Sequence, residues 1–275
     1  MKTPSPNFQD DAEYIDRFVS EEWIGKRLEH KNLVKVISRS TKSKFLYYLM
    51  EELRGQNLAD WLTSKEGNPG VEEVVKITTQ IVDGVRALHR KETLHQDLKL
   101  ENVFIDPEGN VKVIDFGSCN IGGLSAVHTD GIGMVTIDYA ATEYRIDGAS
   151  VGVRSDQFSI AMIAYRLLSG GKCPYGANWD KAQNIRDFSG LDYTPVYAHQ
   201  PMVPVWIDGA LKKALQTSSE SRYYTLSEFI TDLKKPNSEY VEARFMSIIE
   251  KDPLLFWKVT SAILLIALII SLIVD

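Results

Sequence analysis

Hydrophobic residues recur at helical spacing in two segments of the first third of the chain. Residues 15–28 and residues 71–90 both carry apolar side chains three or four positions apart, a pattern that predicts amphipathic helices. The apolar positions are Ile15, Phe18, Val19, Trp23, Ile24 and Leu28 in the first segment and Val74, Ile77, Ile81, Val85 and Leu88 in the second.

Short apolar runs separated by polar or turn-forming residues predict two pairs of strands. Leu33–Ser38 and Lys44–Met50 form one pair with a polar connection. Asn102–Asp106 and Val111–Ile114 form the other pair. The intervening Pro107–Asn110 contains proline, glycine and asparagine, which favour a turn and therefore a hairpin.

The second half of the chain carries further helical patterns. Residues 155–171 are largely apolar but are interrupted by Tyr165 and Arg166, so this helix is too short and too polar to cross a membrane. Residues 203–215 and 224–233 predict closing helices, and residues 237–251 form a polar linker.

The C-terminal residues 254–275 are almost free of charged side chains, unlike the rest of the chain. Lys258 is the only charged residue before the terminal one, and Val259–Val274 contains no ionic residue. A helix rises about 1.5 Å per residue, so this segment would cover roughly 30 Å, the thickness of a hydrocarbon core. The alternative, a buried core helix, is disfavoured because no polar face is present. Phe256 and Trp257 suit the headgroup level. The pattern predicts a single-pass C-terminal membrane anchor.

Composition narrows the class of protein. With 275 residues, 44% hydrophobic and 25% charged, the chain is long enough for one large domain or two lobes with an appendage. The net charge of −6 leaves no broad basic face, so nucleic acid is not an expected partner. Cys119 and Cys173 share no metal-ligand spacing with each other or with a histidine, which favours a reducing compartment. Residues 1–14 lack the apolar stretch of a cleavable signal peptide.

Polar residues with a specific spacing lie between Leu94 and Gly117. The segment reads LHQDLKLENVFIDPEGNVKVIDFG, and it resembles the H-R-D-L-x-x-x-N and D-F-G signatures of eukaryotic-like protein kinases. A single HxD or DFG triplet is common in surface turns, whereas the whole set at this spacing is specific. The resemblance implies an α+β, bilobal kinase-like fold. We expect a partial N-lobe at residues 1–53, a mainly helical C-lobe at 54–236, a linker at 237–253 and the transmembrane anchor at 254–275.

The resemblance also implies a role for each polar residue of this segment. Asp97 would orient the substrate hydroxyl and accept its proton, and Lys99 would contact the transferred phosphoryl group. Asn102 and Asp115 would ligate Mg²⁺, an ion that prefers oxygen ligands. The implied cofactors are ATP and Mg²⁺, and the implied partner is a protein substrate.

Further residues are assigned to ATP by the same resemblance. Lys2 would hold the α- and β-phosphates and pair with a glutamate on the first predicted helix. Glu21 is the expected partner, with the neighbouring Glu22 as the alternative. Met50 would be the gatekeeper at the end of a strand.

The adenine is expected to lie between the hinge and the C-lobe. Glu51 and Leu53 belong to the hinge, whose backbone groups would bond adenine, and Phe104 would lie beneath the ring. These positions follow from the family resemblance alone.

Outside the catalytic segment, five residues have expected structural or specificity roles. Gln96 replaces the arginine that commonly grips a phosphorylated activation loop, which argues against ordering of the loop by that contact. Glu143 stands where the family has A-P-E and should form a buried ion pair with Arg222, while Asp156 should brace the backbone of the catalytic loop, residues 95–102. Thr136 fits serine/threonine specificity.

The sequence also departs from the family in lacking the Gly-rich loop. It contains no G-x-G-x-x-G, and the resemblance would place that loop and its strands ahead of residue 1. The chain is similar to the kinase half of bacterial phosphatase–kinase fusions. We therefore expect a truncated N-lobe with an exposed sheet edge, completed by an upstream domain or a partner, and reduced or absent activity for this chain alone.

Two functions follow from these observations. The first is a membrane-tethered protein serine/threonine kinase whose kinase domain faces the cytoplasm, where ATP is found. The alternative is a catalytically impaired fragment or pseudokinase that acts as a membrane-anchored binding module. Asp97 and Asp115 are both present, which favours the enzyme, because degenerate kinases usually lose one of these aspartates.

Overall fold

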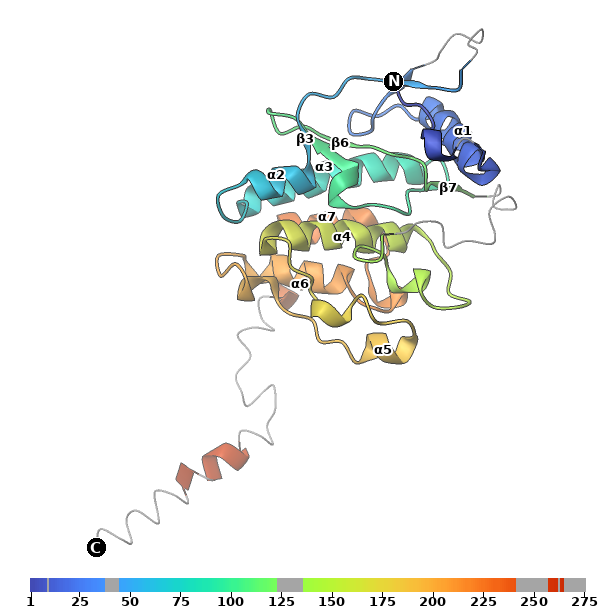
Figure 1. The fold of residues 1–275 in the computed structure, drawn as a ribbon. Helices are drawn as coiled ribbons and strands as arrows, with labels where there is room; N and C mark the ends of the chain where they lie inside the picture. Colours follow the sequence, from blue (N-terminus) through green and yellow to red (C-terminus); the bar gives the residue numbers. More distant parts are fainter. Residues whose placement is uncertain (9, 38–44, 123–135, 241–256, 262, 265–275) are drawn as a thin grey trace, which may run out of the picture.

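The computed structural model describes residues 1–8, 10–37, 45–122, 136–240, 257–261 and 263–264. The fold is α+β, mostly helical with small sheets, as the sequence predicted. A small lobe that contains helix α1 lies against one end of a larger helical lobe (Figure 1). The short 3-10 helices are η1 Pro6–Phe8, η2 Leu100–Asn102, η3 Thr142–Tyr144, η4 Gly176–Asn178, η5 Val196–Ala198 and η6 Ser219–Ser221.

The small lobe consists of α1 (Ala12–Arg27) and an antiparallel pair, β1 (Val36–Ile37) with β2 (Leu49–Met50). Helix α1 begins where the side chain of Asp11 accepts the backbone N–H of Tyr14, a standard N-cap. The predicted helix is confirmed. The paired strands are shorter than the predicted runs, and residues 38–44 lie outside the described part of the chain.

Two small antiparallel sheets lie where the lobes meet. One sheet has the order β3 (Gln56–Asn57), β5 (Val103–Ile105), β6 (Val111–Val113), and the other pairs β4 (Thr93–Leu94) with β7 (Asn120–Ile121). The β5–β6 hairpin is the predicted one, with Val103 opposite Val113. Its residues alternate between buried and half-buried positions, so one face packs on the core.

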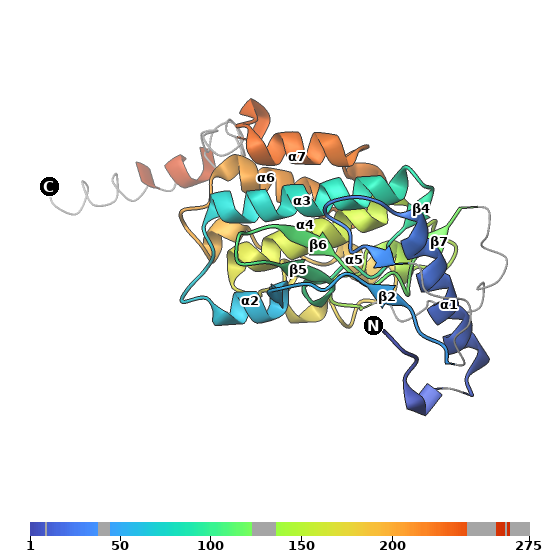
Figure 2. The ribbon, with the colours of Figure 1, turned by 90° about the horizontal axis from the view of Figure 1, so that it is seen from above.

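The large lobe is built from helices α2 to α7. Their bounds are α2 Leu58–Ser64, α3 Val71–His89, α4 Val153–Ser169, α5 Ile185–Ser189, α6 Val205–Ala214 and α7 Leu226–Lys234. Helix α3 packs on α4 and α7, and α6 packs on the same two helices; Figure 2 shows the four running alongside one another. Helix α4 is buried on almost every side, which explains why its sequence is apolar all round.

The predicted C-terminal anchor at 254–275 lies mostly outside the described residues. Within it, residues 257–261 and 263–264 are helical. Across the part of the chain that the structure describes, no helix combines the length and the hydropathy that a membrane span needs.

Candidate active site

The catalytic loop is fixed to the core of the large lobe by Asp156 of α4. The Asp156 carboxylate accepts the backbone N–H groups of His95 and Gln96, each at 3.0 Å, and lies 2.8 Å from Nε2 of His89. Burial opposes the charge of Asp156, but the bonds from the two histidines outweigh it and lower its pKa. Gln96 has a φ of 68°, a left-handed conformation that costs free energy in a non-glycine residue and needs such bracing. The predicted role of Asp156 as a brace is confirmed.

Asp97 is held by bonds to both of its carboxylate oxygens. Oδ1 accepts the backbone N–H and the hydroxyl of Thr136, at 3.1 Å and 2.8 Å. Oδ2 lies 2.8 Å from Nζ of Lys99 and accepts Nδ2 of Asn102 at 3.1 Å. Lys99 also donates to the Thr136 hydroxyl oxygen at 2.8 Å. The structure therefore brings Asp97, Lys99 and Asn102 together as predicted and adds Thr136 to them.

Asn102 and Asp115 lie at the open end of the β5–β6 hairpin, directly before β5 and two residues after β6. The backbone N–H of Ile114 donates to the carbonyl of Asn102 at 2.9 Å, so residue 115 follows directly on a group bonded to residue 102. The amide nitrogen of Asn102 donates to Asp97, so the amide oxygen points away from Asp97. The side chain of Asp115 is 44% exposed. One amide and one carboxylate oxygen fit Mg²⁺, which usually completes its shell with water and phosphate.

Lys2, Glu21 and Asp115 form a charged cluster between the lobes. Nζ of Lys2 donates to both oxygens of Glu21, at 2.7 Å and 2.9 Å, and to Oδ1 of Asp115 at 3.2 Å. Burial lowers the pKa of Lys2, but the two carboxylates outweigh it and raise that pKa, so the lysine stays charged. Glu22 instead pairs with Lys26, four residues along α1, at 2.7 Å. The structure thus selects Glu21 over Glu22 as the partner of Lys2.

Tyr48 is a member of this cluster that the sequence did not reveal. Its hydroxyl donates to Oε1 of Glu21 at 2.6 Å, across 27 positions of sequence. Alternation along the strand would have placed Tyr48 on the same face as Met50. No local pattern, however, links the tyrosine to a helix residue.

The Phe116 side chain lies between α1 and the catalytic loop. Its ring is buried and lies edge-on to the His95 ring, with centroids 6.3 Å apart. A Cβ built on Gly25 of α1 would come 3.4 Å from Phe116 and 2.2 Å from Cγ2 of Val36. Only glycine at residue 25 lets the helix approach this closely, which places Glu21 over the lysine.

The predicted hinge residues lie in the segment that joins the lobes. Met50 and Leu53 are half-buried against the core. The backbone N–H of Glu51 donates to the carbonyl of Lys35 at 2.9 Å, and its side chain accepts Nζ of Lys112 at 2.8 Å. That N–H is therefore engaged within the protein, and the prediction that Glu51 serves adenine rests on its carbonyl.

Phe104 lies on the central strand of the three-stranded sheet, opposite Asn57 and Lys112. It is half-buried. Its contact with an adenine ring remains a prediction, as do those of Met50 and Leu53.

Comparison with known proteins assigns this arrangement to a family. The family model described as protein kinase domain matches residues 1–236. The chain belongs to the protein kinase domain family. This confirms the family predicted from the sequence and accounts for the α+β fold.

The curated relatives of this kinase domain are serine/threonine-protein kinases by name. PrkC of Bacillus subtilis is 26% identical over 230 residues, which cover 83% of this chain and 35% of PrkC. Pkn1 of Myxococcus xanthus is 29% identical over 235 residues, 83% of this chain and 33% of Pkn1. PknL of Mycobacterium tuberculosis is 28% identical over 170 residues, 62% of this chain and 42% of PknL. The chain thus spans about a third of the length of PrkC and Pkn1.

The end of the activation segment, which the family resemblance places at residues 115–143, is fixed in the kinase domain by a buried ion pair. Nη1 and Nη2 of Arg222 donate to the two oxygens of Glu143 at 2.8 Å and 2.9 Å, and the Ser155 hydroxyl donates to the same carboxylate at 2.7 Å. Burial opposes the charge of Glu143, but Arg222 and Ser155 outweigh it and lower the pKa of this carboxyl. The predicted pair is confirmed.

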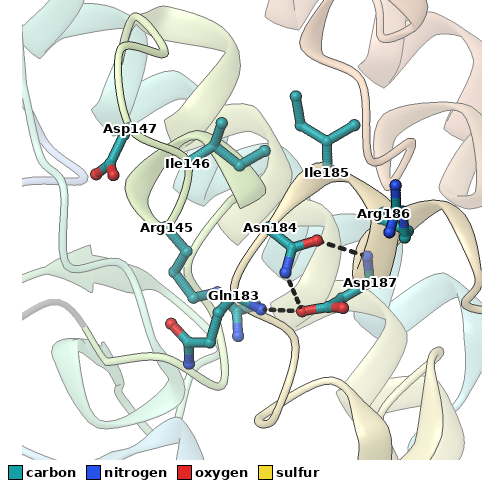
Figure 3. A pocket seen from close by; sticks show the side chains of 8 residues that line it. All are labelled: Arg145, Ile146, Asp147, Gln183, Asn184, Ile185, Arg186 and Asp187. Atoms are coloured by element: carbon teal, nitrogen blue, oxygen red, sulfur yellow. Dashed lines mark hydrogen bonds between the residues drawn. The ribbon is translucent and has the colours of Figure 1, made fainter.

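An open hollow of about 610 Å³ lies on the large lobe, outside this catalytic constellation. It is lined by side chains from the segment after η3 and from the start of α5 (Figure 3). Its lining residues are Arg145, Ile146, Asp147, Gln183, Asn184, Ile185, Arg186 and Asp187. None of the predicted site residues is among them.

Proposed function

We propose that this chain is an ATP-dependent protein serine/threonine kinase that transfers the γ-phosphoryl group of MgATP to a protein hydroxyl. The observation that carries the proposal is the fixed position of Asp97. Both of its oxygens are bonded, to Thr136 on one side and to Lys99 and Asn102 on the other. The relatives named above support serine and threonine as acceptors.

Each residue of the site has a separate role in phosphoryl transfer, a reaction that depends mainly on positioning and charge neutralisation. Asp97 orients the substrate hydroxyl and takes its proton. Lys99 would supply positive charge to the transferred group, and Lys2 would supply it to the α- and β-phosphates. Asn102 and Asp115 hold Mg²⁺, which neutralises the phosphate oxygens when bound. Thr136 keeps Asp97 and Lys99 in place.

The test is phosphate transfer from radiolabelled MgATP to a mixture of serine and threonine peptides by the full chain in detergent. Asp97→Asn should lower transfer by about 100-fold or more, because a positioned base contributes roughly 10² to 10⁴. The matched control is Asp192→Asn, at an exposed aspartate of the large lobe. Equal background in wild type and Asp97→Asn would contradict the kinase proposal. If MgATP still bound under those conditions, the alternative of a kinase-like binding module would be supported.

We also propose that residues 254–275 anchor the chain in a membrane, with the kinase domain on the cytoplasmic side. The support is the sequence: a run without ionic residues from Val259 to Val274, with Lys251 and Lys258 on the cytoplasmic side, as positive-inside placement requires. Deletion of residues 254–275 should move the protein from the membrane fraction to the soluble fraction. A full chain that is already soluble would overturn this proposal.

A further part of the proposal concerns the small lobe. The described sheet there has two strands, β1 and β2, with a single additional bridge between Lys2 and Tyr48. We propose that an upstream domain or a partner chain completes this lobe. Adding that domain or partner chain should raise the affinity of the protein for MgATP, measured by calorimetry. An unchanged affinity would contradict this part of the proposal.

A further inference from the structure

Tyr48 contacts both members of the Lys2–Glu21 ion pair. Its backbone N–H donates to the carbonyl of Lys2, and its carbonyl accepts the N–H of Lys2, each at 3.0 Å. Its hydroxyl donates to Oε1 of Glu21 at 2.6 Å. One residue therefore fixes the backbone of the lysine and the carboxylate of the glutamate.

The charge balance of the cluster explains why a neutral donor is useful there. A single ammonium group, that of Lys2, serves two carboxylates, Glu21 and Asp115. Glu21 is buried, and burial raises its pKa more than Lys2 lowers it. A second cation would satisfy Glu21 but would also compete with Mg²⁺ for Asp115. A hydroxyl supports the carboxylate without adding positive charge.

The state of the Tyr48 hydroxyl suits this task. Burial raises the pKa of Tyr48, and the adjacent Glu21 carboxylate raises it further. The phenol therefore keeps its proton and acts as a donor. Its ring packs against Phe18 of α1, with centroids 5.2 Å apart, so the oxygen is aimed at Glu21 by packing.

We propose that Tyr48 is a positioning residue for MgATP, holding Glu21 in place through its hydroxyl while Lys2 shares its positive charge between Glu21 and the phosphates. The inference rests on the proposed kinase function. Without the hydroxyl, Glu21 would depend on Lys2 alone, and sharing of the Lys2 ammonium group with the phosphates would leave the buried carboxylate with less compensation. With the hydroxyl present, α1 keeps its position when the nucleotide is bound.

Tyr48→Phe tests the proposal, because it keeps the ring and removes only the donor. The KM for MgATP of the full chain should rise about 10-fold, equivalent to 1.4 kcal/mol, while kcat changes less than twofold. Tyr165→Phe is the matched control: it removes the hydroxyl of a buried tyrosine that donates to the carbonyl of Thr194 in the large lobe. The control should leave KM unchanged.

A double variant separates positioning from simple packing, because the Tyr48 hydroxyl donates to the Glu21 carboxylate. In a Glu21→Gln background, Tyr48→Phe should have little additional effect, because the hydroxyl acts through Glu21.

Unchanged KM in Tyr48→Phe would overturn the inference, as would full additivity with Glu21→Gln. If the wild-type chain transferred no phosphate, the kinase proposal would fail separately. The role of Tyr48 would then be read from MgATP binding by calorimetry and from amide hydrogen exchange of α1 in the nucleotide-free chain. Faster exchange of α1 in Tyr48→Phe and not in Tyr165→Phe is expected, and equal exchange in all three would overturn it.

Discussion

Thr136 bridges the two charged groups of the catalytic loop: its hydroxyl donates to Oδ1 of Asp97 at 2.8 Å, and its oxygen accepts Nζ of Lys99 at 2.8 Å. Thr136 lies 39 residues beyond Asp97 in the sequence. The geometry of the proposed base thus depends on a residue outside the catalytic loop.

Thr136→Ala should lower kcat by about 10- to 100-fold, because it removes a hydrogen bond to a charged group. Thr136→Ser keeps the hydroxyl and should retain most of the activity. Steady-state kinetics with a serine peptide gives both values. An alanine variant as active as wild type would show that the bridge does not position Asp97.

Removal of one partner of the Glu143–Arg222 pair should strongly destabilise the large lobe. Both side chains are almost completely buried, so Arg222→Leu leaves an uncompensated carboxylate and should lower the free energy of unfolding by about 3 to 5 kcal/mol. Chemical denaturation measures this. In the double variant with Glu143→Gln the loss should be smaller than the sum of the two single losses, whereas strict additivity would contradict a direct coupling.

Acid should destabilise the domain through the same carboxylate. The pKa of Glu143 in the folded protein is lower than its ordinary 4.5, so the native state binds the proton less tightly than the unfolded chain. The stabilisation is therefore fully present above pH 4.5 and is lost as the pH falls through the lowered pKa. Unfolding free energies measured between pH 7 and pH 3 should fall at the acid end, and less steeply in Glu143→Gln. If the unfolding free energies of wild type and Glu143→Gln fell in parallel with pH, Glu143 would not be the source of the acid destabilisation.

Gly25→Ala should disturb the position of α1. The added Cβ would lie 2.2 Å from Cγ2 of Val36, too close for both atoms, and valine is stiff at χ1. We expect a loss of about 1 to 3 kcal/mol of stability and a higher KM for MgATP. The control Gly190→Ala meets its neighbours at ordinary contact distances. Val36→Ala should restore part of the loss, and no rescue would mean that crowding is not the cause.

The family and most of the helices could be predicted from the sequence. The periodicity of residues 15–28 and 71–90 predicted α1 and α3 within three residues at each end, since the spacing of apolar residues fixes which face of a helix is buried. The spacing of Asp97, Lys99, Asn102 and Asp115 identified the catalytic segment, because the chemistry needs these groups at fixed offsets along one loop and hairpin.

Which side chains meet across long stretches of chain could be seen in the folded structure alone. Glu21 and Glu22 are equivalent in sequence, and the rotation of α1 on Phe116 and Val36 directs Glu21 to Lys2 and leaves Glu22 to Lys26. The bond from Tyr48 to Glu21 and the bridge through Thr136 arise in the same way. Such contacts depend on packing between elements rather than on local spacing, so no pattern within either segment encodes them.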